Sequence, residues 1–134
     1  MSKPNRGARE DGGRLDEKRL LSILLDKELA KFGDSLLNFS YSLALTKRKG
    51  KPTGNNVNNK VLSAAAKNAG IRRMLPSRMD RGDIADSVEA LIGYAWLNRK
   101  VTLDELSSTL EDRIEEPVEA IERLIKIVLK RLRK

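Results

Sequence analysis

Acidic residues lie inside a strongly apolar stretch of the sequence, between Arg81 and Leu97. At about 100° per residue, a helix over this stretch places Asp86 and Glu89 side by side on one face, and Gly93 leaves that face flat enough for another helix to approach. The apolar stripe on the opposite side comprises Ile84, Val88, Leu91 and Ala95. Paired carboxylates ionise at a cost unless a cation lies between them, and oxygen ligands suit Mg²⁺ or Mn²⁺. The spacing is also typical of two solvated acids on the outer face of an amphipathic helix.

A third acid, Asp34, follows Gly33 in a second apolar stretch that begins at Leu29. It is either a metal ligand or a surface acid paired with Lys27 or Lys31, and such a surface pair stabilises a helix by only about 0.3 kcal/mol. A glycine within a helix costs about 1 kcal/mol relative to alanine, so Gly33 predicts a place where another helix approaches closely.

Together the two stretches resemble the endonuclease domain of the ribonuclease III family. Gly33-Asp34, followed by Ser35-Leu36-Leu37, is similar to the family's Gly-Asp motif, and Asp86 to Gly93 reads Asp-x-x-Glu-Ala-Leu-Ile-Gly without a gap. The resemblance covers about residues 25–100 and looks closest to the small bacterial form, mini ribonuclease III, which has no double-stranded-RNA-binding domain. It implies an all-α, ribonuclease III endonuclease-domain helical fold.

The resemblance also implies an activity. The protein would be a metal-dependent endoribonuclease that hydrolyses phosphodiester bonds in double-stranded or structured RNA, leaving 5′-phosphate and 3′-hydroxyl ends, with a ribosomal RNA precursor stem as the substrate. Asp34, Asp86 and Glu89 would be the catalytic residues and the ligands of Mg²⁺, with Mn²⁺ as an alternative. Ala30 stands where the larger enzymes have a further carboxylate, which leaves the number of metal ions open. Asp86, by contrast, resembles the larger enzymes.

Two other classes of function stay open. One is a non-catalytic RNA-binding or ribosome-assembly protein of the same fold, and the other is a helical protein whose dimer is its only function. A histidine-based, cysteine-based or disulfide chemistry is excluded, because the chain contains neither residue. A net charge of +8 favours a polyanionic partner such as RNA.

The 134 residues, 40% hydrophobic and 34% charged, fit one globular domain and no membrane helix. We expect a disordered basic tail over residues 1–14, a single domain over residues 15–134, no membrane partner and a cytoplasmic location. Helices are predicted to start near Asp16, Lys27, Asn58, Asp80, Thr102 and Pro117, and no strand is expected. The second helix should end at Leu45 and bury Leu29, Phe32, Leu36, Phe39 and Leu43.

Two basic clusters are candidates for binding RNA phosphates. The first is a predicted loop, 46–56, and the second lies just before the acidic helix. Their members are Lys47, Arg48, Lys49 and Lys51 in the first, and Arg72, Arg73, Arg78 and Arg81 in the second. Each cluster could instead be an ordinary solvated surface.

A homodimer is the final expectation. Cutting both strands of a duplex calls for two sites related by a two-fold axis, and one small domain offers a single acidic site. The family resemblance implies that the helix with the Gly-Asp motif takes part in the subunit contact, so residues 27–37 are the candidates, with Gly33 allowing close approach.

Overall fold

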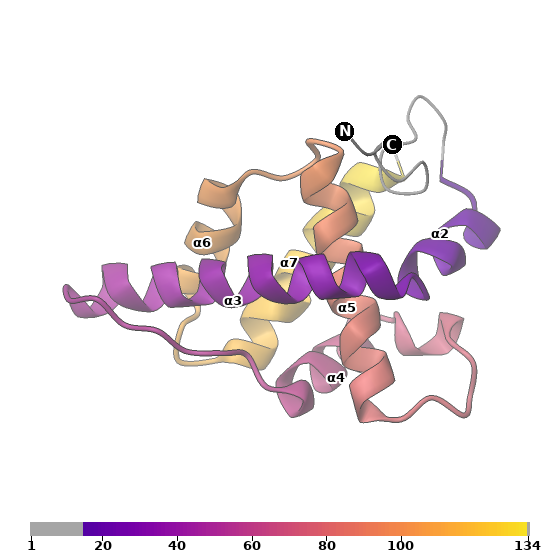
Figure 1. Cartoon of the computed structure of the whole chain (residues 1–134), viewed down its shortest axis with the longest axis horizontal. Coiled ribbons are helices and arrows are strands. Elements are labelled where there is room, and N and C mark those ends of the chain that lie inside the picture. The colour runs from indigo at the N-terminus through magenta and orange to yellow at the C-terminus, as the bar shows by residue number, and fades with distance from the viewer. Residues whose placement is uncertain (1–14, 134) are drawn as a thin grey trace.

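The chain folds into helices throughout residues 15–133, the part described by this computed structural model. The tail expected over residues 1–14 lies outside the described residues. Within 15–133 there are six α-helices, one 3-10 turn and no strand (Figure 1). They are α2 (Glu17–Leu24), α3 (Lys27–Lys49), α4 (Asn59–Asn68), the 3-10 turn η1 (Arg72–Met74), α5 (Arg81–Leu97), α6 (Leu103–Asp112) and α7 (Pro117–Leu132). The predicted all-α fold is confirmed.

Short-range chemistry fixes where most helices begin. The Asp16 carboxylate accepts a hydrogen bond from the Arg19 backbone amide at 2.8 Å and caps α2. Asp80 and Asp83 form a reciprocal capping box at the start of α5, and Thr102 begins α6 with a second such box. These helix starts are the ones that the sequence predicts.

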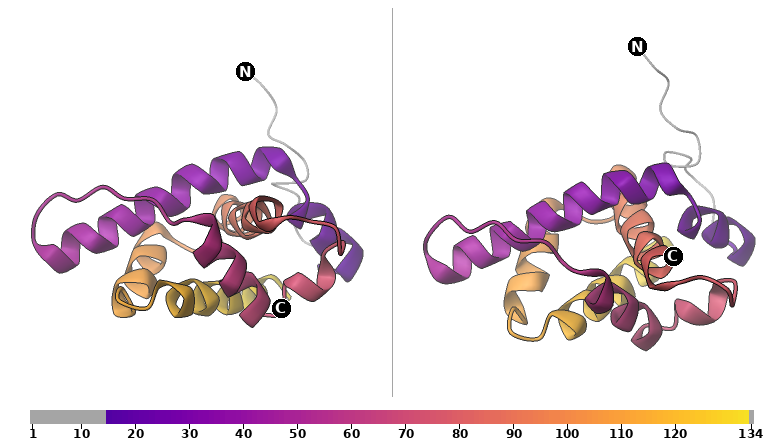
Figure 2. Two further views of the ribbon diagram at one scale, coloured as in Figure 1. Left: turned by 90° about the horizontal axis from the view of Figure 1, so that it is seen from below. Right: turned by 60° about the horizontal axis from the view of Figure 1, so that its bottom comes forward.

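Helix α5 is the centre of the molecule. Eleven of its residues are buried, and it packs against α2, α3, α4 and α7. Figure 2 shows α5 nearly end-on in its left view, between α3 on one side and α7 on the other. A helix surrounded in this way is apolar on almost every side, so any polar residue on it needs a specific partner.

The predicted buried face of α3 is wrong in part. Leu29 is buried, but Phe32 is 37% exposed and Phe39 is 54% exposed, while Leu36 and Leu43 are half-buried. The buried positions of α3 are Leu29, Ala30, Gly33, Leu37, Ser40, Ala44 and Leu45. Most of these side chains are small, because α5 crosses α3 too closely for large ones to fit between the two helices.

Two glycines allow that close crossing. A Cβ atom at Gly33 would overlap the backbone carbonyl oxygen of Glu89. A Cβ atom at Gly93 would lie 3.1 Å from the Leu29 carbonyl oxygen and 3.3 Å from the Gly33 Cα atom. The predicted close helix approach at Gly33 is therefore confirmed, but the partner is α5 of the same chain. Gly33 is consequently not available to bring a second subunit close, and that part of the dimer expectation is wrong.

The first basic cluster lies mostly on a helix. The sequence predicts a loop from residue 46, whereas α3 continues to Lys49, so the loop prediction is wrong for Lys47, Arg48 and Lys49. Gly50 then ends the helix with a φ of 72°, and Lys51 lies beyond it. Basic residues in the last turn are favoured by the helix dipole, which explains why the helix extends through them.

Candidate active site

The three predicted acids meet at one pocket. Asp34 comes from α3, and Asp86 and Glu89 come from α5, and all three line an open pocket of about 290 Å³. The remaining lining residues are Lys27, Ala30, Lys31 and Asn59. The close crossing at Gly33 is what brings the acids of two helices to the same place.

Glu89 differs from its neighbours because it is buried. Its side chain is only 5% exposed, so the interpretation as a solvated surface acid is wrong for this residue. Burial raises the pKa of the Glu89 carboxyl to about 8, and a hydrogen bond with Asp34 and the negative charges of Asp34 and Asp86 act in the same direction. At neutral pH the Glu89 carboxyl is therefore mostly protonated and hydrogen-bonds with Asp34.

Asp86 has a cation as its partner. The Lys27 ammonium lies 3.0 Å from Asp86 Oδ2 and 3.4 Å from Asp83 Oδ1. The hydrogen bond to Asp86 is the main reason why the pKa of Lys27 is raised. The sequence suggests a pair of Lys27 with Asp34, but the structure pairs Lys27 with the acids of α5. The charged side chains of the pocket thus form two pairs. Asp34 is paired with Glu89, and Asp86 is paired with Lys27.

Asp34 is exposed and is oriented by its own helix. Its Oδ1 atom accepts a hydrogen bond from Asn38 Nδ2 at 3.1 Å, and Asn38 Oδ1 in turn accepts one from the Val57 backbone amide at 2.9 Å. This chain of contacts links the acid to the segment that leads into α4. The first residue of α4, Asn59, also lines the pocket.

Three lining residues were not identified as site residues from the sequence. Lys27 lies two helical turns before Asp34 and Lys31 one turn before it, but from the sequence both are interpreted only as surface partners of that acid. Asn59 carries no such signal, because the turn that brings α4 beside α5 depends on the tertiary fold. Ala30 lines the pocket without offering a polar group.

The basic residues that were predicted to bind RNA lie outside this pocket. The Lys47 ammonium donates to Ser107 Oγ at 3.3 Å, and Arg48 donates to the Glu111 carbonyl oxygen at 2.8 Å, so both are directed toward α6. Lys47 is 13 residues from Asp34 on α3, which corresponds to about 20 Å. Lys49 and Lys51 are exposed.

The second basic cluster is divided by the structure. The Arg72 guanidinium donates to the carbonyl oxygens of Pro76 at 3.2 Å and Ser77 at 3.0 Å, which holds the connector before α5 in place. Arg73, Arg78 and Arg81 are exposed on the same stretch. Arg72 thus has a structural task, while the other three arginines can reach an external partner.

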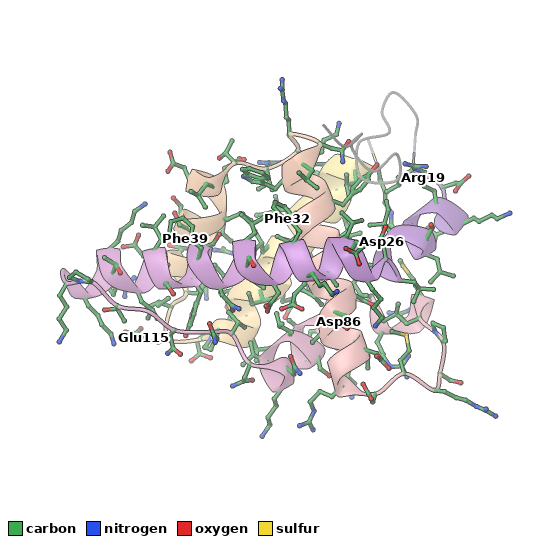
Figure 3. All side chains as sticks on the ribbon, viewed as in Figure 1. Arg19, Asp26, Phe32, Phe39, Asp86 and Glu115 are labelled. Atoms are coloured by element: carbon green, nitrogen blue, oxygen red, sulfur yellow. The ribbon has the colours of Figure 1, made fainter. Side chains whose placement is uncertain are left out.

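An aromatic patch lies on the other side of the crossing. We define it as Phe32, Phe39 and Trp96, which are among the large exposed hydrophobic residues. The rings of Phe32 and Trp96 are 5.7 Å apart between centroids and tilted by 43°. Figure 3 shows Phe32 and Phe39 along one side of α3, with Asp86 on the opposite side.

The acidic side chains of the pocket offer oxygen ligands of the kind that Mg²⁺ and Mn²⁺ prefer. All candidate ligands are carboxylate oxygens, and a protonated carboxyl as buried as Glu89 gains most from a cation that would replace its proton. Within residues 15–133, however, no three acidic side chains are arranged to hold a metal ion as they stand.

Comparison with known proteins identifies the chain by family. Residues 27–133 match the family described as Ribonuclease III, and the match includes Asp34, Asp86 and Glu89. A search of curated proteins finds no match. Among the described helices, none is long and apolar enough to cross a membrane. Because the family match covers most of the sequence and the helical fold agrees with it, the chain belongs to the ribonuclease III family, whose members are endoribonucleases acting on RNA.

Proposed function

We propose that this protein is a metal-dependent endoribonuclease that cuts double-stranded or structured RNA, with its active site at the pocket between α3 and α5. One observation carries the proposal. Asp34 and Glu89 come from separate helices, yet they share a hydrogen bond inside the pocket, and Asp86 lines the same pocket. A structural role alone does not explain why a buried helix would hold such an acid.

Asp34, Asp86 and Glu89 are the proposed ligands of Mg²⁺, and Mn²⁺ is the alternative. Bound there, the cation would lower the pKa of a water molecule and neutralise charge on the phosphate. Glu89 would lose its proton when the cation binds, because the cation offsets the cost of burying the charge. Asn38 keeps Asp34 oriented toward the pocket during this exchange.

RNA binding is proposed to depend on phosphates and on duplex shape. A small helical domain cannot read bases in the deep, narrow major groove of A-form RNA. Arg73, Arg78 and Arg81 are the basic residues best placed to contact the backbone beside α5, because all three are exposed. Lys49 and Lys51 extend the basic surface at the far end of α3.

A two-fold dimer completes the proposal. The aromatic patch supports it, because large exposed aromatic side chains on one face of α3 are typical of a protein contact. This patch replaces Gly33 as the basis for the subunit contact within the predicted range, residues 27–37, and extends it to Phe39 and Trp96. Two copies would supply two sites, one for each RNA strand.

The remaining expectations stay predictions. A ribosomal RNA precursor stem as substrate rests only on the resemblance to the small bacterial enzymes. The single domain over residues 15–134 and the cytoplasmic location are predictions from length and composition. The non-catalytic RNA-binding protein remains the alternative function.

A cleavage assay on a generic RNA duplex tests the proposal directly. Wild-type protein should cut the duplex with Mg²⁺ and should not cut it in EDTA. Asp34→Asn keeps the shape and the hydrogen bond from Asn38 but removes a ligand charge, so it should bind the duplex and leave it intact. Duplex binding without any cutting by the wild-type protein in Mg²⁺ or Mn²⁺ would favour the non-catalytic alternative.

A further inference from the structure

One neutral polar side chain, that of Asn59, lines the pocket between α3 and α5. The other polar residues of the lining are all ionisable, and they are Lys27, Lys31, Asp34, Asp86 and Glu89. Asn59 is exposed, and within residues 15–133 its side-chain amide takes part in no hydrogen bond. The fold therefore leaves both the donor and the acceptor of this amide available to a ligand.

The position of Asn59 relative to α5 places its amide close to the acids. A Cβ atom at Gly82 would lie 3.8 Å from Asn59 Nδ2, so the amide lies beside the first turn of α5. Gly82, Asp86 and Glu89 follow one another at intervals of four and three residues, which places them on one face of that helix. The Asn59 amide thus extends the row of acids by about one helical turn.

Hydrogen bonds connect the start of α4 to the acid on α3. Asn38 Nδ2 donates to Asp34 Oδ1 at 3.1 Å, and Asn38 Oδ1 accepts from the Val57 backbone amide at 2.9 Å. The next residue, Asn58, caps α4 with its side chain. Two consecutive asparagines therefore differ in their tasks, because the fold uses the side chain of Asn58 and leaves that of Asn59 free for a ligand.

The chemistry of RNA offers a group that matches this amide. The ribose 2′-hydroxyl both donates and accepts hydrogen bonds, and its carbon is bonded to the carbon that carries the 3′-oxygen of the cleaved bond. A scissile phosphate at the acids therefore brings a 2′-hydroxyl to the same pocket. The ammonium groups of the lining only donate, and carboxylates that hold a cation only accept, whereas an amide does both.

We infer that Asn59 hydrogen-bonds the 2′-hydroxyl of the nucleotide on the 5′ side of the cleaved bond, and that it thereby selects RNA over DNA at the pocket. This inference rests on the proposed function and specifies which feature of its substrate the pocket recognises. It adds a contact to the sugar to the proposed contacts with phosphates and duplex shape.

A duplex with one altered sugar tests the inference. The cut in each strand of a generic RNA duplex is first mapped with the full chain in Mg²⁺. In a second duplex, the nucleotide on the 5′ side of one cut carries 2′-fluoro, which keeps the A-form sugar shape but cannot donate a hydrogen bond. With protein in excess, the wild-type protein should cut the altered strand about fivefold more slowly, as expected for one neutral hydrogen bond. The unaltered strand should be cut at an unchanged rate.

Asn59→Leu keeps the approximate size of the side chain and removes the amide. It should cut the all-RNA duplex about fivefold more slowly than the wild-type protein and should cut the altered strand no more slowly than that. Asn59→Ala should behave in the same way, and circular dichroism checks that both variants keep their helices. Asn68→Leu is the matched control, because it changes an exposed asparagine at the other end of α4, outside the pocket. It should behave as the wild-type protein does on both duplexes.

Two results would overturn the inference. If the wild-type protein cuts the altered and unaltered sugars at equal rates, the pocket does not detect the 2′-hydroxyl. If the Asn59 variants are slow on both duplexes but still discriminate against the altered sugar, the amide contacts another part of the RNA. Failure of the proposed function looks different, because the wild-type protein would then cut neither duplex, and the inference would fall with it.

Discussion

The crossing of α3 and α5 has two sides with opposite chemistry. On one side the helices gather Asp34, Asp86 and Glu89 around a pocket, and on the other they gather Phe32 and Trp96 on an exposed patch. The same backbone contact, at Gly33 and Gly93, places both groups. The proposed catalytic side and the proposed subunit side therefore depend on the same backbone contact. A change in that contact should affect both sides, whereas a side-chain change should affect only one.

The largest effect is expected from Gly33→Ala. The new Cβ atom would overlap the Glu89 carbonyl oxygen, which belongs to the backbone and cannot move aside, so α3 and α5 must separate. We expect a loss of about 3 kcal/mol in the free energy of unfolding, together with loss of cleavage and of the dimer. Urea denaturation measures the free energy of unfolding, an RNA duplex assay measures cleavage, and sedimentation measures the dimer.

Gly93→Ala is the matched control for that change. The distance from its Cβ atom to the Leu29 carbonyl oxygen would be 3.1 Å, which requires only a small shift. Alanine also has a higher helix propensity than glycine, by about 1 kcal/mol, which offsets part of the strain. The loss should therefore be clearly smaller than for Gly33→Ala. Equal stabilities of the two variants would contradict the close contact at Gly33.

Glu89→Gln should affect the acidic side alone. Glutamine has the shape of the protonated glutamic acid that the fold holds at neutral pH, but it cannot ionise when a cation binds. We expect cleavage to fall by at least ~100-fold, while duplex binding and dimerisation change little and the folded state is not destabilised. Glu122→Gln, which removes a half-buried carboxylate on α7 that does not line the pocket, should cut at the wild-type rate. Wild-type cleavage by Glu89→Gln would remove Glu89 from the site.

Phe39→Glu should affect the aromatic side alone. Phe39 is 54% exposed, so a charge there is tolerated by a single chain but not at the centre of a subunit contact. At micromolar concentration the wild-type protein should sediment as two chains of 15.0 kDa each, and the variant as one. Leu25→Glu, at a residue 41% exposed outside the patch, should stay dimeric. A wild-type protein that sediments as a single chain would end the two-strand cleavage proposal.

The pH dependence separates Glu89 from the other acids. Its pKa is raised in the folded state to about 8, above the unfolded value near 4.5, so its contribution to stability is complete below pH 4.5 and is lost as the pH rises toward 8. Compared with Glu89→Gln, the wild-type protein without metal should therefore lose stability between pH 5 and 8, by up to about 1.4 kcal/mol per pH unit. Thermal unfolding of both proteins over this range measures the difference, and parallel curves would contradict the buried proton.

The smallest effect concerns RNA affinity. Removing Arg73, Arg78 and Arg81 together should flatten the slope of log affinity against log salt concentration on a duplex by up to about 3 units, if each contacts one phosphate. Removing Lys47, Arg48 and Lys49 has the same upper limit, but we expect less, because Lys47 and Arg48 already donate to α6. Equal slopes for the wild-type protein and both triple variants would make the two clusters ordinary solvated surfaces.

The sequence by itself determined the helices and the acids. Caps such as Asp16, Asp80 and Thr102 act over three residues, so their effect is visible without the fold. The spacing of Asp86 and Glu89 likewise places them on one face of any helix. The family motifs added Asp34, which the spacing alone leaves as either a ligand or a surface acid.

Only the tertiary structure decided which face of α3 is buried, whether Glu89 is protonated and which cation pairs with Asp86. Phe32 and Phe39 repeat at a helical period, as a buried stripe does, but the close crossing admits only small residues such as Ala30 and Gly33, so the aromatic rings remain outside. Burial depends on the distance to a neighbouring helix, which hydrophobicity along one segment does not encode. For the same reason the protonation of Glu89 and the contact of Lys27 with Asp86 could not be predicted, because each depends on atoms about 55 residues away in the chain.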